Sequence, residues 1–280
     1  MVDTGPCSGH RTGQRMQQVR GGLRGCRAPV AGVASGAWIL VTVLLLVVTP
    51  ALAAREGHPL TDAEYAASIS GTVTYAGPGF AVTLLDMSMD PVCVELNRAN
   101  PQRREVPVLG AGRRIAHVLV QIKGGLPHTE YEPPGTVVEF DQSGCRFAPH
   151  VFGLRVGQTL RVLNPDGTLH TVHAYSRVNP GFNDAMPRFR TVLERVFVKA
   201  EPTPFVVKCE VHPWMSAWVA VFDHPFYFVT GRDGSFRIGN LPAGTYELEL
   251  WHEWLPAQTH TVTVGAGESV RVDAVMRVGR

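Results

Sequence analysis

The sequence lacks helical patterning. After residue 53, no segment repeats apolar residues with the spacing of an amphipathic helix, and no internal repeat or low-complexity run is present. Its 29 glycines and 21 prolines instead separate short stretches in which apolar and polar residues alternate. Such alternation is typical of half-buried strands, so the pattern predicts an all-β protein.

Charge is also scarce, at 18% of residues, and neither sign dominates. The chain has 26 basic and 24 acidic residues, but residues 1–53 hold five arginines and one aspartate. Without that segment, 21 basic and 23 acidic residues remain, a net charge of −2. Because no basic surplus remains, we expect no nucleic-acid binding.

Paired carboxylates with lyase or hydrolase character are absent, and no oxyanion hole is evident. A cysteine–histidine nucleophile is conceivable, but such pairs usually come from distant parts of a chain. We therefore predict that the protein is not an enzyme.

What is present begins with a basic segment followed by the apolar run "AWILVTVLLLVVTPALA". Together with the Ala51-x-Ala53 pattern, this predicts a secretory signal over residues 1–53, cleaved after Ala53. Extended back to Ala31, the run approaches the length of a membrane span, so an uncleaved anchor is the alternative. Either implies a periplasmic or other extracytoplasmic location, with membrane contact only through this segment. A polar linker is expected over residues 54–65.

Cysteine is sparse, and only Cys93, Cys145 and Cys209 follow the leader. In an exported protein, where disulfides can form, three cysteines leave at least one without a disulfide partner in the same chain. Either Cys93 pairs with Cys145 and leaves Cys209 free, or another pairing holds, or the first two are separate buried thiols. Export favours the Cys93–Cys145 bridge, which would pin the loop 87–115 to the rest of the fold. A bound metal would occupy the remaining thiol.

The stretch "PFVVKCEVHPWM" alternates until its cysteine, so Phe205, Val207 and Cys209 are expected on one inward face. Cys209, His212 and Met215 then follow at three-residue intervals. Zinc sites do not choose methionine, whereas thiolate, imidazole and thioether ligands together favour copper. The missing second histidine is expected from "NPDGTLHTVHA", with His170 preferred over His173 because of its place at a strand end.

These segments resemble the cupredoxins over residues 138–223, and their motif is most similar to amicyanin- and plastocyanin-like domains. The resemblance implies a Greek-key β-sandwich that holds one copper ion in a type 1 site. Its ligands would be His170, Cys209 and His212, with Met215 in the axial position. It also implies a one-electron carrier.

Two further expectations come from this resemblance. His212 would lie nearest solvent, and a redox protein partner would dock near His212 and Trp214. Many cupredoxins have asparagine directly after the first histidine ligand, where this chain has Thr171. His173 has no ligand role in the pattern and would give hydrogen-bonding support at most.

The tail resembles a second family. "TGRDGSFRIGNLPAGTYELELWHE" is similar to carboxypeptidase regulatory-like and rhamnogalacturonan-lyase-type modules, which have a transthyretin-like or carbohydrate-binding-like β-sandwich fold. We predict an N-terminal β segment over 66–133, a cupredoxin domain over 134–223 and this sandwich tail over 224–280, with a hairpin turning at Asp233-Gly234. The first and last segments would form one sandwich if the copper domain is inserted between them.

The leading hypothesis is therefore an exported type 1 copper electron carrier. The alternatives are a copper-binding or storage protein without an electron-transfer role, and a cell-surface module that binds a glycan or a protein.

Overall fold

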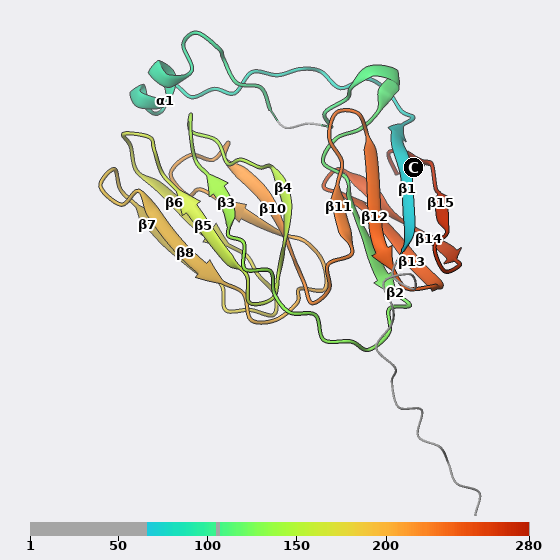
Figure 1. Cartoon of the computed structure of the whole chain (residues 1–280). Coiled ribbons are helices and arrows are strands. Elements are labelled where there is room, and N and C mark those ends of the chain that lie inside the picture. Colours follow the sequence, from blue (N-terminus) through green and yellow to red (C-terminus); the bar gives the residue numbers. More distant parts are fainter. Residues whose placement is uncertain (1–65, 105–106, 280) are drawn as a thin grey trace, which may run out of the picture. The chain divides into compact units, whose positions relative to one another are not determined.

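The computed structural model describes residues 66–104 and 107–279. The predicted signal peptide or anchor and the linker lie outside the described residues. The regular secondary structure of the described part is nearly all β-strand, which confirms the all-β prediction (Figure 1). Within it, no helix has the length and apolar character needed to cross a bilayer.

Eight strands form a first sandwich, here called the site sandwich. They are β3 (Val138–Asp141), β4 (Val151–Arg155), β5 (Thr159–Leu163), β6 (His170–Ala174), β7 (Phe182–Met186), β8 (Val192–Val196), β9 (Phe205–Lys208) and β10 (Ser216–Phe222). One sheet has the order β4-β10-β9-β6-β7 and the other the order β3-β5-β8. Side chains from both sheets, among them Phe140 and Val219, share one buried core.

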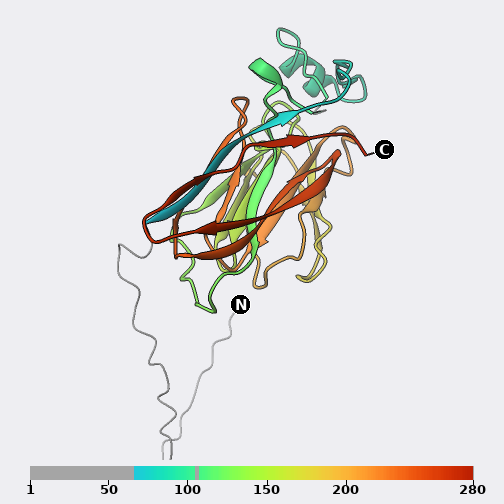
Figure 2. The same cartoon turned by 90° about the vertical axis from the view of Figure 1, so that its right-hand side faces the viewer.

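The remaining strands form a second sandwich. They are β1 (Ala67–Tyr75), β2 (Leu119–Gly124), β11 (Tyr227–Val229), β12 (Ser235–Leu241), β13 (Gly244–His252), β14 (Leu255–Val264), β15 (Ser269–Arg271) and β16 (Ala274–Met276). β1 lies between β12 and β15 and also pairs with β16, while β11-β2-β13-β14 form the facing sheet. Figure 2 shows the first described strand running beside the last ones. The site sandwich is therefore inserted, in sequence, between strands of the second sandwich.

The predicted hairpin around Asp233-Gly234 is wrong. β11 pairs with β2 and β12 pairs with β1, so the two strands belong to different sheets. The turn itself forms, since Gly234 has a φ of +63° and its N–H donates to the carbonyl of Gly231. Local residues thus specify a reversal, but the strands available on either side decide the pairing.

A buried polar contact joins the two sandwiches. The Nε2 of His150, at the start of β4, lies 2.5 Å from Oε1 of Glu253, which follows β13. The indole N–H of Trp218 on β10 donates to the other carboxylate oxygen at 2.8 Å. A small apolar cluster that includes Leu119 and Phe222 lies at the same joint.

Residues 80–104, here called the cap segment, belong to the connection between β1 and β2 of the second sandwich and lie outside any sheet. The segment contains a helix that the sequence pattern did not indicate, α1 (Pro91–Leu96). The Asp90 carboxylate accepts the N–H groups of Val92 and Cys93, and Pro91 follows at the first helical position. An aspartate cap followed by proline is a favourable helix start, but six residues are too few to show periodicity. A 3-10 turn, η1 (Ala111–Arg113), follows further along the chain.

Several contacts fasten the cap segment to the site sandwich. Cys93 forms a disulfide with Cys145. The hydroxyl of Thr168 donates to Asp90 Oδ2 at 2.7 Å. The side-chain amide of Asn97 donates to the carbonyl of Gly144 at 3.0 Å.

Candidate metal centre

Strand pairing brings the predicted donors together. His170 is the first residue of β6, and Cys209 directly follows β9, which pairs antiparallel with β6. His212 lies in the short loop between β9 and β10. The inward face predicted for β9 is confirmed, because Phe205, Val207 and Cys209 are all buried.

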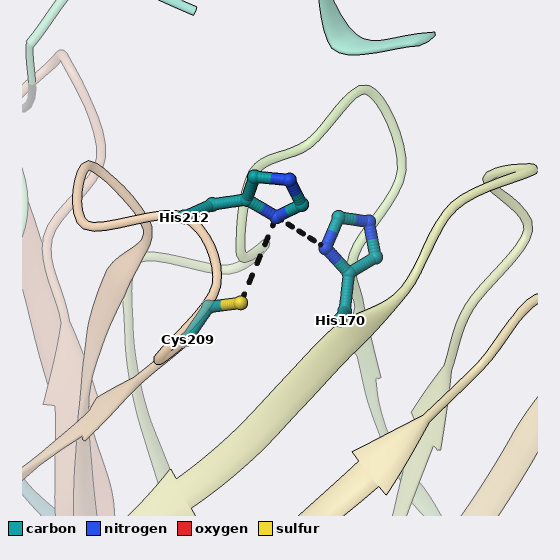
Figure 3. A group of neighbouring side chains, drawn as sticks. All are labelled: His170, Cys209 and His212. Atoms are coloured by element: carbon teal, nitrogen blue, oxygen red, sulfur yellow. Dashed lines mark hydrogen bonds between the residues drawn. The ribbon is translucent and has the colours of Figure 1, made fainter. Parts of the chain in front are cut away.

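Three donor atoms converge in the space between these elements (Figure 3). Nδ1 of His170 lies 2.9 Å from Nδ1 of His212, and Sγ of Cys209 lies 3.7 Å from the latter atom. The chosen donor atoms of the three residues all lie within 4.8 Å of one another. Cys209 is the free thiol among the cysteines of the described residues. The side chains of His170, Cys209 and His212 are almost completely buried.

Met215 closes the same loop. Its N–H donates to the carbonyl of His212 at 2.9 Å, and its own carbonyl accepts the N–H of Cys209 at 3.2 Å. The side chain is buried in the core of the site sandwich together with Cys209. Met215 also borders a surface pocket of about 170 Å³, which is lined in addition by Glu253 and Trp254. These backbone bonds hold Met215 in the same short loop as Cys209 and His212.

A carboxylate lies within hydrogen-bonding distance of the Nε2 atom of each imidazole. Nε2 of His170 lies 3.0 Å from Asp166 Oδ2, and Nε2 of His212 lies 3.1 Å from Asp90 Oδ2. Each carboxylate favours a proton on Nε2, which leaves Nδ1 as the inward donor atom. Carboxylate partners of this kind orient histidine ligands and raise their basicity in metal sites.

The Cys209 thiol already has the charge that a metal ligand needs, whereas the His170 imidazole keeps an extra proton. Burial raises the pKa of the Cys209 thiol, but hydrogen bonds to His170, His212 and the N–H of Thr171 outweigh it and lower the pKa to about 5. Burial likewise lowers the pKa of His170, but Asp166 and the neighbouring sulfur outweigh it and raise the pKa to about 9. Without metal, a thiolate therefore faces a protonated imidazole, and a cation that binds there must displace one proton.

Thr171 ties the two ligand segments together. Its N–H donates to Cys209 Sγ at 3.4 Å, and its hydroxyl accepts the N–H of Glu210 at 2.6 Å. The threonine thus makes a direct connection between β6 and the ligand loop, at the position where many cupredoxins have asparagine.

The expectation that His212 lies nearest solvent is wrong. Its exposed fraction is 1% because the cap segment covers it. Asp90 approaches its outer nitrogen, and Cys93 Sγ lies 3.7 Å from the same atom. Trp214 is half-buried, and its indole N–H donates to the carbonyl of Cys145 at 3.0 Å. The cap was missed because its residues show no periodic pattern.

The sequence reading also missed both carboxylates. Asp90 reads as an ordinary residue before proline, and Asp166 reads as part of the "NPDG" turn. Asp166 also accepts the backbone N–H groups of Gly144 and Cys145, so it connects His170 to the disulfide. His173 lies outside the donor group, and its Nδ1 lies 2.7 Å from Glu210 Oε1.

No family model and no curated protein matches the sequence. Among solved structures, a purple cupredoxin from Nitrosopumilus maritimus is 18% identical over 30% of this chain and 99% of its own, with a TM-score of 0.26. A methionine variant of amicyanin in its Cu(I) form is 19% identical over 37% of this chain and 98% of its own, with a TM-score of 0.28. A copper-containing nitrite reductase from Thermus scotoductus SA-01 is 20% identical over 42% of this chain, with a TM-score of 0.27. This chain spans a quarter of that reductase. The likeness is weak, cupredoxin-like and partial.

Proposed function

We propose that the protein is an exported type 1 copper protein that carries single electrons. The observation that carries this proposal is the convergence of Nδ1 of His170, Nδ1 of His212 and Sγ of Cys209 in a buried space, with Met215 in the same short loop as the last two residues. Two imidazoles, a thiolate and a thioether form the donor set that suits blue copper. When bound, copper supplies the Cu(I)/Cu(II) couple.

The protein holds these donor atoms in a fixed arrangement that is shielded from water. His170 and Cys209 are set by paired strands, and His212 and Met215 by a short loop with internal backbone hydrogen bonds. Asp166 hydrogen-bonds the outer nitrogen of His170, so that ring cannot rotate freely. A site that cannot rearrange changes little between oxidation states, which favours electron transfer. The disulfide is consistent with an extracytoplasmic location.

A spectrum tests the proposal. Copper-loaded protein should absorb intensely at roughly 600 nm through thiolate-to-copper charge transfer, and ascorbate should bleach the band reversibly. Cys209→Ser should abolish the band. His128→Ala, which replaces an exposed histidine in the connection between β2 and β3, should retain it. A wild-type protein that binds no copper, or binds it without this band, would refute the proposal.

The burial of His212 supports a second candidate, a copper-holding protein without a redox partner, because a sealed site exchanges metal slowly. Such a protein would bind Cu(I) and stay colourless after mild oxidation. An electron carrier would cycle between coloured and colourless forms without losing metal.

A further inference from the structure

The side of the site nearest His212 is closed to a redox partner. The cap segment lies over the imidazole, with the Asp90 carboxylate and the Cys93–Cys145 disulfide against its outer nitrogen. A partner cannot touch His212 without displacing covalently fastened chain. An electron exchanged on this side would have to tunnel across the cap segment.

The surface beside Glu210 carries an exposed aromatic group. Tyr175 has an exposed fraction of 42%, and its ring stacks on that of His173 with 4.0 Å between centroids. The phenol hydroxyl donates to Glu210 Oε1 at 2.8 Å, and His173 Nδ1 lies 2.7 Å from the same oxygen. The ammonium group of Lys208 lies 5.8 Å from the centre of the tyrosine ring. We call these four residues the tyrosine face.

The tyrosine face is connected directly to the thiolate. Glu210 follows Cys209 in the chain, so its backbone is covalently continuous with the donor sulfur. A second connection runs through Thr171, which donates its N–H to Sγ and accepts the Glu210 N–H on its hydroxyl. The path from Sγ to the Glu210 carboxylate therefore runs mainly through covalent bonds and hydrogen bonds. That carboxylate contacts the exposed Tyr175 and the half-buried His173.

We propose that electrons enter and leave through Cys209 and Glu210 by way of the tyrosine face, and not through His212. This inference rests on the proposed function. In each exchange, one electron passes from a reduced site to an oxidised site. No bond is broken, no proton moves, and Tyr175 is a contact and tunnelling medium that is not itself oxidised. The role also gives a reason for the stacking of His173, which lies outside the donor group, against the tyrosine ring.

Electron self-exchange tests the route, because the protein serves as its own partner. Mixtures of Cu(I) and Cu(II) protein are examined by proton NMR, and the second-order rate constant comes from line broadening against concentration. Three exposed residues are each replaced by serine: Tyr175 on the tyrosine face, Met89 on the cap segment and Trp254 at the pocket beside Met215. Tyr175→Phe keeps the ring but removes the hydroxyl bond to Glu210, so it separates these two contributions.

We expect Tyr175→Ser to slow self-exchange by about tenfold, through loss of an aromatic contact from each of two meeting faces. Met89→Ser and Trp254→Ser should stay within about twofold of wild type, whereas Tyr175→Phe, which keeps the ring but loses the hydroxyl bond to Glu210, should lie between wild type and Tyr175→Ser. All variants should keep the thiolate-to-copper band, which shows that the site itself is intact. If Met89→Ser or Trp254→Ser is slowed as much as Tyr175→Ser, or if Tyr175→Ser is not slowed, the route is wrong. A coloured wild-type protein with such results would leave the proposed function standing, whereas a protein without the band would overturn both.

Discussion

Removing the disulfide of the cap segment should open the metal centre. In the Cys93→Ala/Cys145→Ala variant, the cap would be fastened mainly by hydrogen bonds such as those of Asp90 with Thr168 and His212. Each such bond contributes roughly 1 kcal/mol. The segment should then open more often, expose His212 and let copper leave faster.

The size of the effect follows from the loop that the bridge closes. Cys93 and Cys145 are 52 residues apart. For a loop of that length, the chain-entropy model gives about 4 kcal/mol at 25 °C. This value is an upper limit, because β2 and β3 lie inside the loop and stay folded when only the cap opens. An increase of about 4 kcal/mol in favour of opening corresponds to about a thousandfold larger open population.

Extraction of Cu(I) by an excess of a chromophoric chelator measures this opening. The first-order rate constant should rise between about tenfold and about a thousandfold in the double variant relative to wild type. Urea unfolding of both proteins identifies any contribution from global unfolding. Met89→Ser, which changes the cap surface but keeps the bridge, should extract at the wild-type rate. Equal rates for wild type and double variant would refute the reasoning, since copper would then leave by a path that the cap does not close.

Two predictions concern the donors themselves. Asp166→Asn should lower copper affinity by about 10–100-fold, because the hydrogen-bond partner of His170 loses its charge. Chelator competition measures the affinity, with Asp233→Asn at an exposed position as the control. An unchanged affinity would contradict this prediction. Copper affinity should also depend on pH: the pKa of His170 is raised to about 9 and that of Cys209 is lowered to about 5, so between these values binding displaces one proton, from the imidazole. Affinity should therefore rise about tenfold per pH unit between pH 5 and pH 9, and more steeply below pH 5, where the thiol is also protonated. A flat profile in chelator competition across this range would contradict the assignment of the protonated imidazole.

Several features of this protein follow from short-range pattern. Alternation over residues 205–209 correctly predicted which side of β9 is buried, because neighbouring side chains on a strand must point to opposite faces. The closely spaced Cys209, His212 and Met215 indicated copper by donor type alone. Their assignment as ligands remains a prediction, although the structure places the first two beside His170.

Contacts between distant segments could not be predicted in this way. Asp90 lies 122 residues before His212, and no local pattern marks it as the neighbour of that ring. The partners of β11 and β12 were equally out of reach, because alternating strands fit either sheet. Residue types and strand faces depend on chemistry within a few positions, so they can be read along the chain. The burial of His212, the two carboxylates behind the imidazoles and the exposure of Tyr175 depend on which distant segments pack together, and only folding in three dimensions decides that.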